Sequence, residues 1–134
     1  MNQMLVIDCS FLMSCIPPDE ERIFDDISQC ILYVPAIFYT ECGSVLNTAI
    51  NRTRIIEKNA EEYLNIIRSF TIEVDIFCSK HESMLIIHNI ARQNRLTPYD
   101  ACYFELAKRL NSPIATRDKA LIKACQENSI LIFE

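Results

Sequence analysis

The chain has 134 residues, half of them hydrophobic, and a formal net charge of −5 at pH 7. This length fits a single domain with a substantial apolar core. The acidic balance argues against a broad electrostatic surface for nucleic acid. It is compatible with an acidic site that recruits metal cations, which then supply positive charge locally.

The cysteines and the first residues of the chain indicate the cellular compartment of the protein. Its seven cysteines are scattered and contain no Cys-x-x-Cys pair, which favours buried thiols in a reducing cytoplasm over a disulfide framework or a zinc site. The first apolar run is interrupted by Asp8 and has no basic flank. We therefore expect neither a signal peptide nor a membrane span, and a cytoplasmic protein.

Short apolar runs alternate with segments of helical periodicity along the whole chain. Strands are predicted at residues 4–7, 31–34, 71–76, 113–116 and 130–133. Helices are predicted from near residue 17, and over residues 36–50, 55–70, 80–94, 98–110 and 119–127. This alternation predicts one α/β domain over residues 1–134, with a mainly parallel sheet of about five strands flanked by helices. The continuous apolar run at residues 4–7 is predicted to be central, and the alternating run at 71–76 to form an edge.

The helix predicted at residues 98–110 has the strongest start signal. Thr97 is a candidate N-cap and Pro98 suits the first helical position. Tyr99 and Tyr103 lie on its apolar face, so both are predicted to pack in the core. His88 lies on the apolar face of the preceding helix and is also predicted to be a packing residue.

Four carboxylates fall beside strand ends. Asp8 ends the first strand, Glu41 lies in the first turns of the helix after the second, Asp100 opens the helix before the fourth, and Asp118 follows the fourth. Sites in parallel α/β sheets lie beyond the carboxyl ends of the strands, so all four could face one edge. Each of three has a structural alternative: Asp8 and Asp118 as helix or turn caps, and Asp100 in a capping box. Glu41 borders an apolar helix face and needs a partner.

Clustered carboxylates repel one another, and at least one would keep its proton near neutral pH. Mg²⁺ or Mn²⁺ relieves this repulsion because both ions prefer oxygen ligands. Such a metal site can activate a bound water and stabilise the oxygens of a phosphodiester. Ser10 and Thr116 could hold a carboxylate, a metal-bound water or a phosphate oxygen, or could serve only in turns and caps.

These residues resemble the PIN-domain nucleases, and most of all the VapC-type toxins. The likeness covers nearly the whole chain through residues 6–10 (VIDCS), 35–41 (PAIFYTE), 96–107 (LTPYDACYFELA) and 115–121 (ATRDKAL). The resemblance implies a twisted parallel sheet and a site that binds Mg²⁺ or Mn²⁺. Its implied catalytic and metal-binding residues are Asp8, Glu41, Asp100 and Asp118, with Ser10 and Thr116 as polar helpers.

The resemblance also implies a substrate and partners. The substrate would be single-stranded or loop RNA, with transfer RNA as one candidate, and Arg117 and Lys119 beside Asp118 would meet its phosphates. The protein would be the toxin of a type II toxin–antitoxin pair, would form a homodimer, and would be blocked by a VapB-type antitoxin. The helices between residues 36 and 70 have enough apolar content to contain such an interface.

Other classes fit less well. A catalytically silent PIN-like module that binds RNA or protein is the main alternative, although no acidic position is missing. A receiver domain would need a Lys after its final strand, and a phosphohydrolase with an Asp nucleophile would need a second Asp at the position of Ser10.

Overall fold

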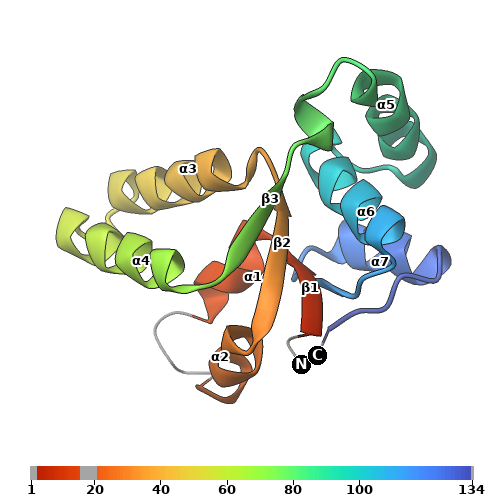
Figure 1. Cartoon of the computed structure of the whole chain (residues 1–134). Helices are drawn as coiled ribbons and strands as arrows, with labels where there is room; N and C mark the ends of the chain where they lie inside the picture. Colours follow the sequence, from red (N-terminus) through yellow and green to blue (C-terminus); the bar gives the residue numbers. More distant parts are fainter. Residues whose placement is uncertain (1–2, 16–20, 134) are drawn as a thin grey trace.

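The computed structural model describes residues 3–15 and 21–133. Strands and helices alternate along them as the sequence predicts (Figure 1). The strands are β1 (Gln3–Ile7), β2 (Cys30–Pro35), β3 (Ile72–Asp75) and β4 (Ile114–Ala115). The helices are α1 (Cys9–Ser14), α2 (Glu21–Ser28), α3 (Phe38–Asn51), α4 (Glu57–Ser69), the 3-10 helix η1 (Phe77–Ser79), α5 (Ser83–Asn94), α6 (Pro98–Leu110) and α7 (Lys119–Glu127).

The strands form one parallel sheet in the order β3-β2-β1-β4. As predicted, β1 is central and β3 is an edge strand. Leu5, Val6 and Ile7 are at most 1% exposed, as expected for a strand that is covered on both faces. The α/β fold with its parallel sheet is therefore confirmed.

Two predicted details differ from the structure. Residues 130–133 join the sheet through a single bridge between Ile114 and Ile132, because β4 is only two residues long and offers little ladder for another strand. The segment after Asp8, where no helix was predicted, forms the short helix α1. The start signal at Pro17 and Pro18 lies outside the described residues.

Helices cover both faces of the sheet. Figure 1 shows α3 and α4 on one side of the strands and α5 and α6 on the other, with the carboxyl ends of β2 and β3 pointing toward the gap between α3 and α6. Within the described residues, every helix falls short of the length and apolar content needed to cross a bilayer.

Helix α6 is the best-packed helix, and its local sequence explains both ends. The Thr97 hydroxyl accepts the Asp100 backbone N–H at 3.1 Å, and Pro98 occupies the first helical position. The helix ends at Asn111, which adopts the left-handed conformation with φ 51°. Between these ends, six residues of the helix are buried: Ala101, Cys102, Tyr103, Phe104, Leu106 and Ala107.

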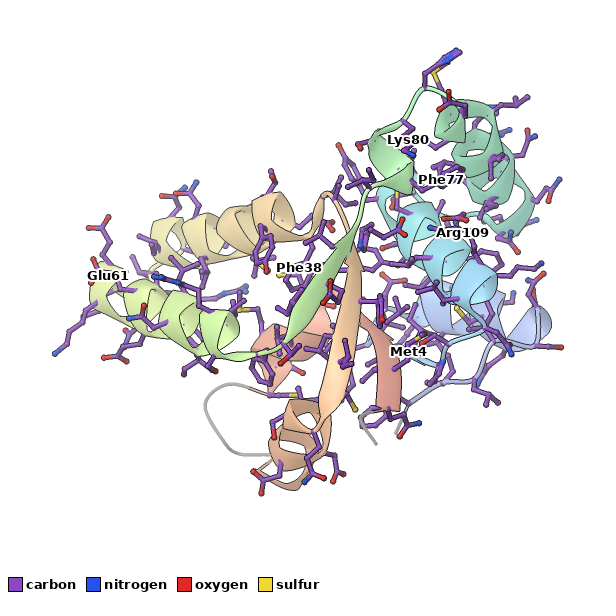
Figure 2. The ribbon with its side chains drawn as sticks, in the orientation of Figure 1. Met4, Phe38, Glu61, Phe77, Lys80 and Arg109 are labelled. Atoms are coloured by element: carbon purple, nitrogen blue, oxygen red, sulfur yellow. The ribbon has the colours of Figure 1, made fainter. Side chains whose placement is uncertain are left out.

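An ion pair joins the edge strand to α6. The Arg109 guanidinium donates to Asp75 at 2.7 Å and to Glu105 at 2.8 Å, and it lies 5.1 Å from the centre of the Phe77 ring. Figure 2 shows Arg109 beside Phe77. This contact holds the segment between β3 and α5 against α6.

Candidate metal centre at the carboxyl edge of the sheet

Asp8 is fixed by three hydrogen bonds at the end of β1. Its Oδ1 atom accepts the Phe11 backbone N–H at 2.8 Å and the Ser10 hydroxyl at 2.9 Å, so Asp8 is the N-cap of α1. The Thr116 hydroxyl donates to the other oxygen, Oδ2. Asp8 is only 6% exposed and Thr116 only 3%. Of the roles considered for Ser10 and Thr116, the structure therefore displays that of holding a carboxylate.

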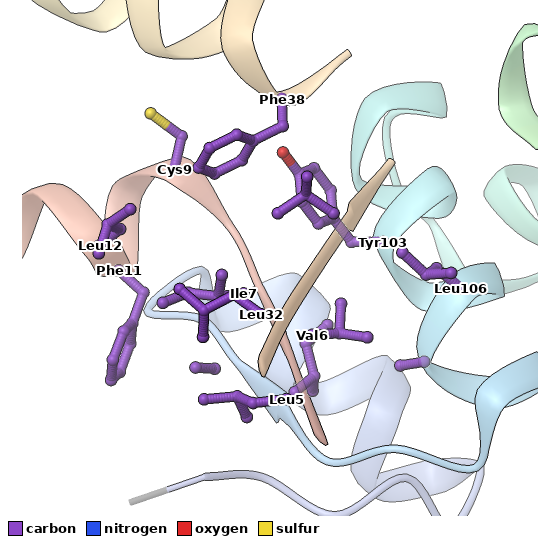
Figure 3. Packing of buried hydrophobic residues seen from close by; sticks show 14 of the residues in the cluster. Leu5, Val6, Ile7, Cys9, Phe11, Leu12, Leu32, Phe38, Tyr103 and Leu106 are labelled. Carbon is purple, nitrogen blue, oxygen red and sulfur yellow. The ribbon is translucent and has the colours of Figure 1, made fainter. Parts of the chain in front are cut away.

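Glu41 has the partner that its position demands. The Tyr103 hydroxyl donates to Glu41 Oε1 at 2.7 Å, across 62 positions in the chain. Figure 3 shows the Tyr103 hydroxyl directed toward Phe38, at the start of α3. Tyr103 is 1% exposed. Its burial is the main cause of its raised pKa, and the neighbouring Glu41 raises the pKa further, so the hydroxyl keeps its proton and can donate it in the hydrogen bond. Sequence reasoning placed Tyr103 correctly in the core but did not find this contact.

Asp100 and Asp118 both lie at the start of a helix. Asp100 follows the Thr97 cap, and Asp118 is the N-cap of α7, accepting the Leu121 N–H at 2.8 Å. Thr116 connects Asp118 to Asp8, because its oxygen also accepts the Asp118 backbone N–H at 3.1 Å. The capping role considered for Asp118 is therefore present, whereas at Asp100 the cap is Thr97 and the backbone N–H of Asp100 is the group that is capped.

A thiol contact lies next to the site in the core. Cys9 and Cys42 lie close together, so that the Cys42 thiol and then burial raise the pKa of the Cys9 thiol, and each cysteine follows a site carboxylate in sequence. Both cysteines are at most 4% exposed. This contact ties α1 to α3 and fixes the backbone from which Asp8 and Glu41 project. All seven cysteines are buried or half-buried, as predicted.

The four carboxylates affect one another electrostatically. Burial, followed by the charges of Asp118 and Asp8, raises the pKa of Asp100 from 3.8 to about 6, and Glu41 adds to the shift. Burial raises the pKa of Asp8, and Asp118 raises it further against the hydrogen bonds from Thr116, Phe11 and Ser10. Burial and Asp8 raise the pKa of Glu41. The four predicted residues thus share one region of negative potential.

The two basic residues beside Asp118, Arg117 and Lys119, have different surroundings. Arg117 extends over α1, where its Nε atom donates to the Ser14 hydroxyl at 2.7 Å and its guanidinium lies 5.0 Å from the centre of the Phe11 ring. Lys119 is exposed at the start of α7. Both positive charges flank the acidic edge.

The donor set of this edge suits a hard divalent cation. Carboxylate and hydroxyl oxygens are the ligands that Mg²⁺ and Mn²⁺ prefer. Among residues 3–15 and 21–133, no three His, Cys, Asp or Glu side chains are close enough together to coordinate an ion as they stand. Binding a metal would therefore require the carboxylates to move closer together.

A parallel α/β sheet with acidic residues from four elements at its carboxyl edge defines the class of this protein. The chain belongs to the PIN domain family, whose model matches residues 5–127. PIN domains are generally metal-dependent nucleases. No curated protein matches the chain significantly.

Several solved structures are similar to it, among them PAE2754 and FitAcB. PAE2754 from Pyrobaculum aerophilum is 20% identical, with a TM-score of 0.71, over 91% of this chain and 79% of that one. FitAcB from Neisseria gonorrhoeae is 17% identical, with a TM-score of 0.57, over 98% of this chain and 97% of that one. At these identities the likeness supports the fold.

Proposed function

We propose that this protein is a metal-dependent endoribonuclease that hydrolyses phosphodiester bonds in single-stranded or loop RNA. One observation carries the proposal: carboxylates from four separate elements lie near one edge of the sheet, and burial together with neighbouring carboxylates raises the pKa of Asp8, Glu41 and Asp100. Such an arrangement is unfavourable in the absence of a cation, and a divalent ion would remove the repulsion.

Asp8, Glu41, Asp100 and Asp118 would hold Mg²⁺ or Mn²⁺. When bound, the ion would supply an activated water and neutralise charge on the phosphate oxygens. Thr116 and Ser10 fix both oxygens of Asp8, and Tyr103 fixes one oxygen of Glu41. These hydrogen bonds orient Asp8 and Glu41, and an ion would still have to draw the four carboxylates closer together.

Positive side chains beside the acidic edge would contact the RNA backbone. Lys119 is exposed next to Asp118, and Arg117 holds its charge over Phe11. We assign both to phosphate binding, which gives affinity without sequence preference.

We also propose that the protein is a cytoplasmic toxin of a type II toxin–antitoxin pair, a homodimer inhibited by a VapB-type antitoxin. A groove between α3 and α4, with a cavity volume of about 540 Å³, is available for the antitoxin. Tyr39 and Leu64 line it, and both are more than 40% exposed. The alternative is a catalytically silent PIN-like module that binds RNA or protein.

The test is cleavage of a mixed cellular RNA pool with Mg²⁺, with Mn²⁺ and with chelator. Asp118→Asn is the informative variant, since Asn also caps helices and the fold should survive. Asp25→Asn, at an exposed position on α2, is the matched control. We expect metal-dependent fragments from the wild type and the control, and none from Asp118→Asn.

Two results would contradict this assignment. Cleavage retained by Asp118→Asn would remove Asp118 from the site. A folded wild-type protein that binds RNA but cuts nothing with either metal would identify the silent module instead.

A further inference from the structure

A second cavity lies beside the start of α6, the helix that carries Asp100. It lies between η1, the first half of α5 and the start of α6, and has a volume of about 500 Å³, within the range of small-molecule sites. Its lining includes Ile37, Lys80, His81, His88 and Tyr99. We call it the α5–α6 pocket.

Two residues that line the pocket are close neighbours of candidate metal-binding residues along their helices. Tyr99 immediately precedes Asp100 on α6, and Ile37 lies one helical turn before Glu41 on α3. A polynucleotide whose phosphate lies at the carboxylates would therefore pass this pocket with its neighbouring nucleotide. The Arg109 contact described above holds η1, and with it this wall of the pocket, against α6.

Tyr99 presents an aromatic surface at the rim of the pocket. The sequence predicted a core position for it, and this prediction was wrong: Tyr99 is 61% exposed, whereas Tyr103 on the same helix is 1% exposed. Exposing a large aromatic ring beside a cavity has a hydration cost that a stacked ligand would remove. Nucleobases stack on such rings irrespective of their identity.

The one formally charged side chain among the residues lining the pocket is positive, in a protein that is acidic overall. The chain carries 18 acidic and 13 basic residues, yet none of the described residues lining this pocket is acidic. Lys80 supplies a positive charge, and both histidines of the chain, His81 and His88, line the wall. His88 is exposed, so its predicted packing role was also wrong. These groups suit an anionic ligand with an aromatic part.

We propose that the α5–α6 pocket binds one nucleotide of single-stranded RNA, next to the phosphate that would be bound at the proposed metal centre. The base stacks on Tyr99, and the phosphate or ribose contacts Lys80 and the histidines. The inference rests on the proposed nuclease function and names where that site recognises unpaired RNA. Paired bases are already stacked on both faces, so the pocket selects single strands.

The test measures RNA binding apart from cleavage. A short fluorescein-labelled single-stranded RNA is titrated with protein in chelator, and binding is followed by fluorescence anisotropy. Removing one base–aromatic stack costs about 1–3 kcal/mol, so Tyr99→Ala should weaken binding by about 5- to 150-fold. Tyr99→Phe keeps the ring and should bind like the wild type. Tyr39→Ala is the matched control, because Tyr39 is 51% exposed on α3 and lines the other groove.

Two further measurements separate the contacts. Lys80→Ala should lower the slope of log affinity against log salt by about 1, as expected for one lost phosphate contact. With metal present, Tyr99→Ala should raise KM and leave kcat near that of the wild type, because the pocket binds RNA outside the reacting atoms.

The outcomes distinguish this proposal from the nuclease assignment. If the wild type cuts RNA and Tyr99→Ala has an unchanged KM and affinity, the pocket proposal fails alone. If the wild type binds without cutting and Tyr99→Ala binds less, the pocket stands and the nuclease fails. If the wild type binds no RNA, both fail. An altered oligomeric state of Tyr99→Ala with unchanged RNA affinity would make this face a protein interface, beside the exposed Met84 and Leu85, and would overturn the proposal.

Discussion

Replacing Asp100 by Asn should stabilise the metal-free protein at pH 7. Its pKa rises from 3.8 to about 6 through burial and the charges of Asp118 and Asp8. The folded state therefore takes up a proton between about pH 6 and pH 4, and this group destabilises the fold as the pH rises through that window. The two pKa values differ by about two pH units, which corresponds to about 3 kcal/mol. Since the carboxylate is only half-buried, solvent screening reduces this to about 1–2 kcal/mol.

The Asn side chain keeps an oxygen that can accept from Thr97 but loses a negative charge in the first turn of α6. That loss costs about 0.3–1 kcal/mol, so the net gain at pH 7 is about 1 kcal/mol. Urea unfolding with chelator, followed by circular dichroism at pH 7 and pH 4, measures it, with Asp25→Asn as the exposed control. The gain should vanish at pH 4, where the folded wild type is protonated. An Asn variant that is less stable at pH 7, or equally more stable at both pH values, would refute this reasoning.

Three other substitutions probe the contacts around the site and the end of α5. Tyr103→Phe removes the hydrogen-bond donor to Glu41 and should lower the free energy of unfolding by about 1.5 kcal/mol. This is the low end for a charged acceptor, because Glu41 is half-buried and can recruit water. The variant should also bind Mn²⁺ more weakly in a calorimetric titration, and an unchanged Mn²⁺ affinity would show that Tyr103 does not position Glu41. Arg95 ends α5 with φ 55°, so Arg95→Gly should raise the free energy of unfolding by about 1 kcal/mol. Arg92→Gly, inside the last turn of α5, should lower it by about 1 kcal/mol, and the same sign for both variants in urea unfolding would contradict the backbone argument.

The parts of the fold that sequence predicted are those with local causes. Helix α6 begins at a capping Thr and a Pro, and β1 is a continuous apolar run, so neither needs tertiary information. Helix α1 has six residues, too few to show helical periodicity, and its only signal was the capping residue Asp8. The sequence could not show that residues 130–133 would add only one bridge, because strand length depends on the neighbour.

The features of the candidate site also differ in whether the sequence could predict them. The ends of parallel strands share an edge, so topology alone was enough to predict that the four carboxylates lie near the same edge. The bond between Tyr103 and Glu41 could not, since it depends on how α6 packs against α3 across 62 positions. The side on which Tyr99 lies was equally hidden, because helical spacing gives Tyr99 and Tyr103 one face and only packing decides which is covered.

Helix capping and metal binding are compatible roles for the same aspartates. Asp118 caps α7 through Oδ1, and Asp8 caps α1 through Oδ1. An ionised carboxylate has two oxygens and about four acceptor positions, so a cap occupies only part of its capacity. The helix N-termini also direct partial positive charge at the acidic edge, which offsets some of the repulsion without a cation. The capping hydrogen bonds therefore position the carboxylates of Asp8 and Asp118. A divalent ion would neutralise the negative charge that these bonds do not offset. Asn retains the cap and removes that charge, so Asp118→Asn separates the two roles.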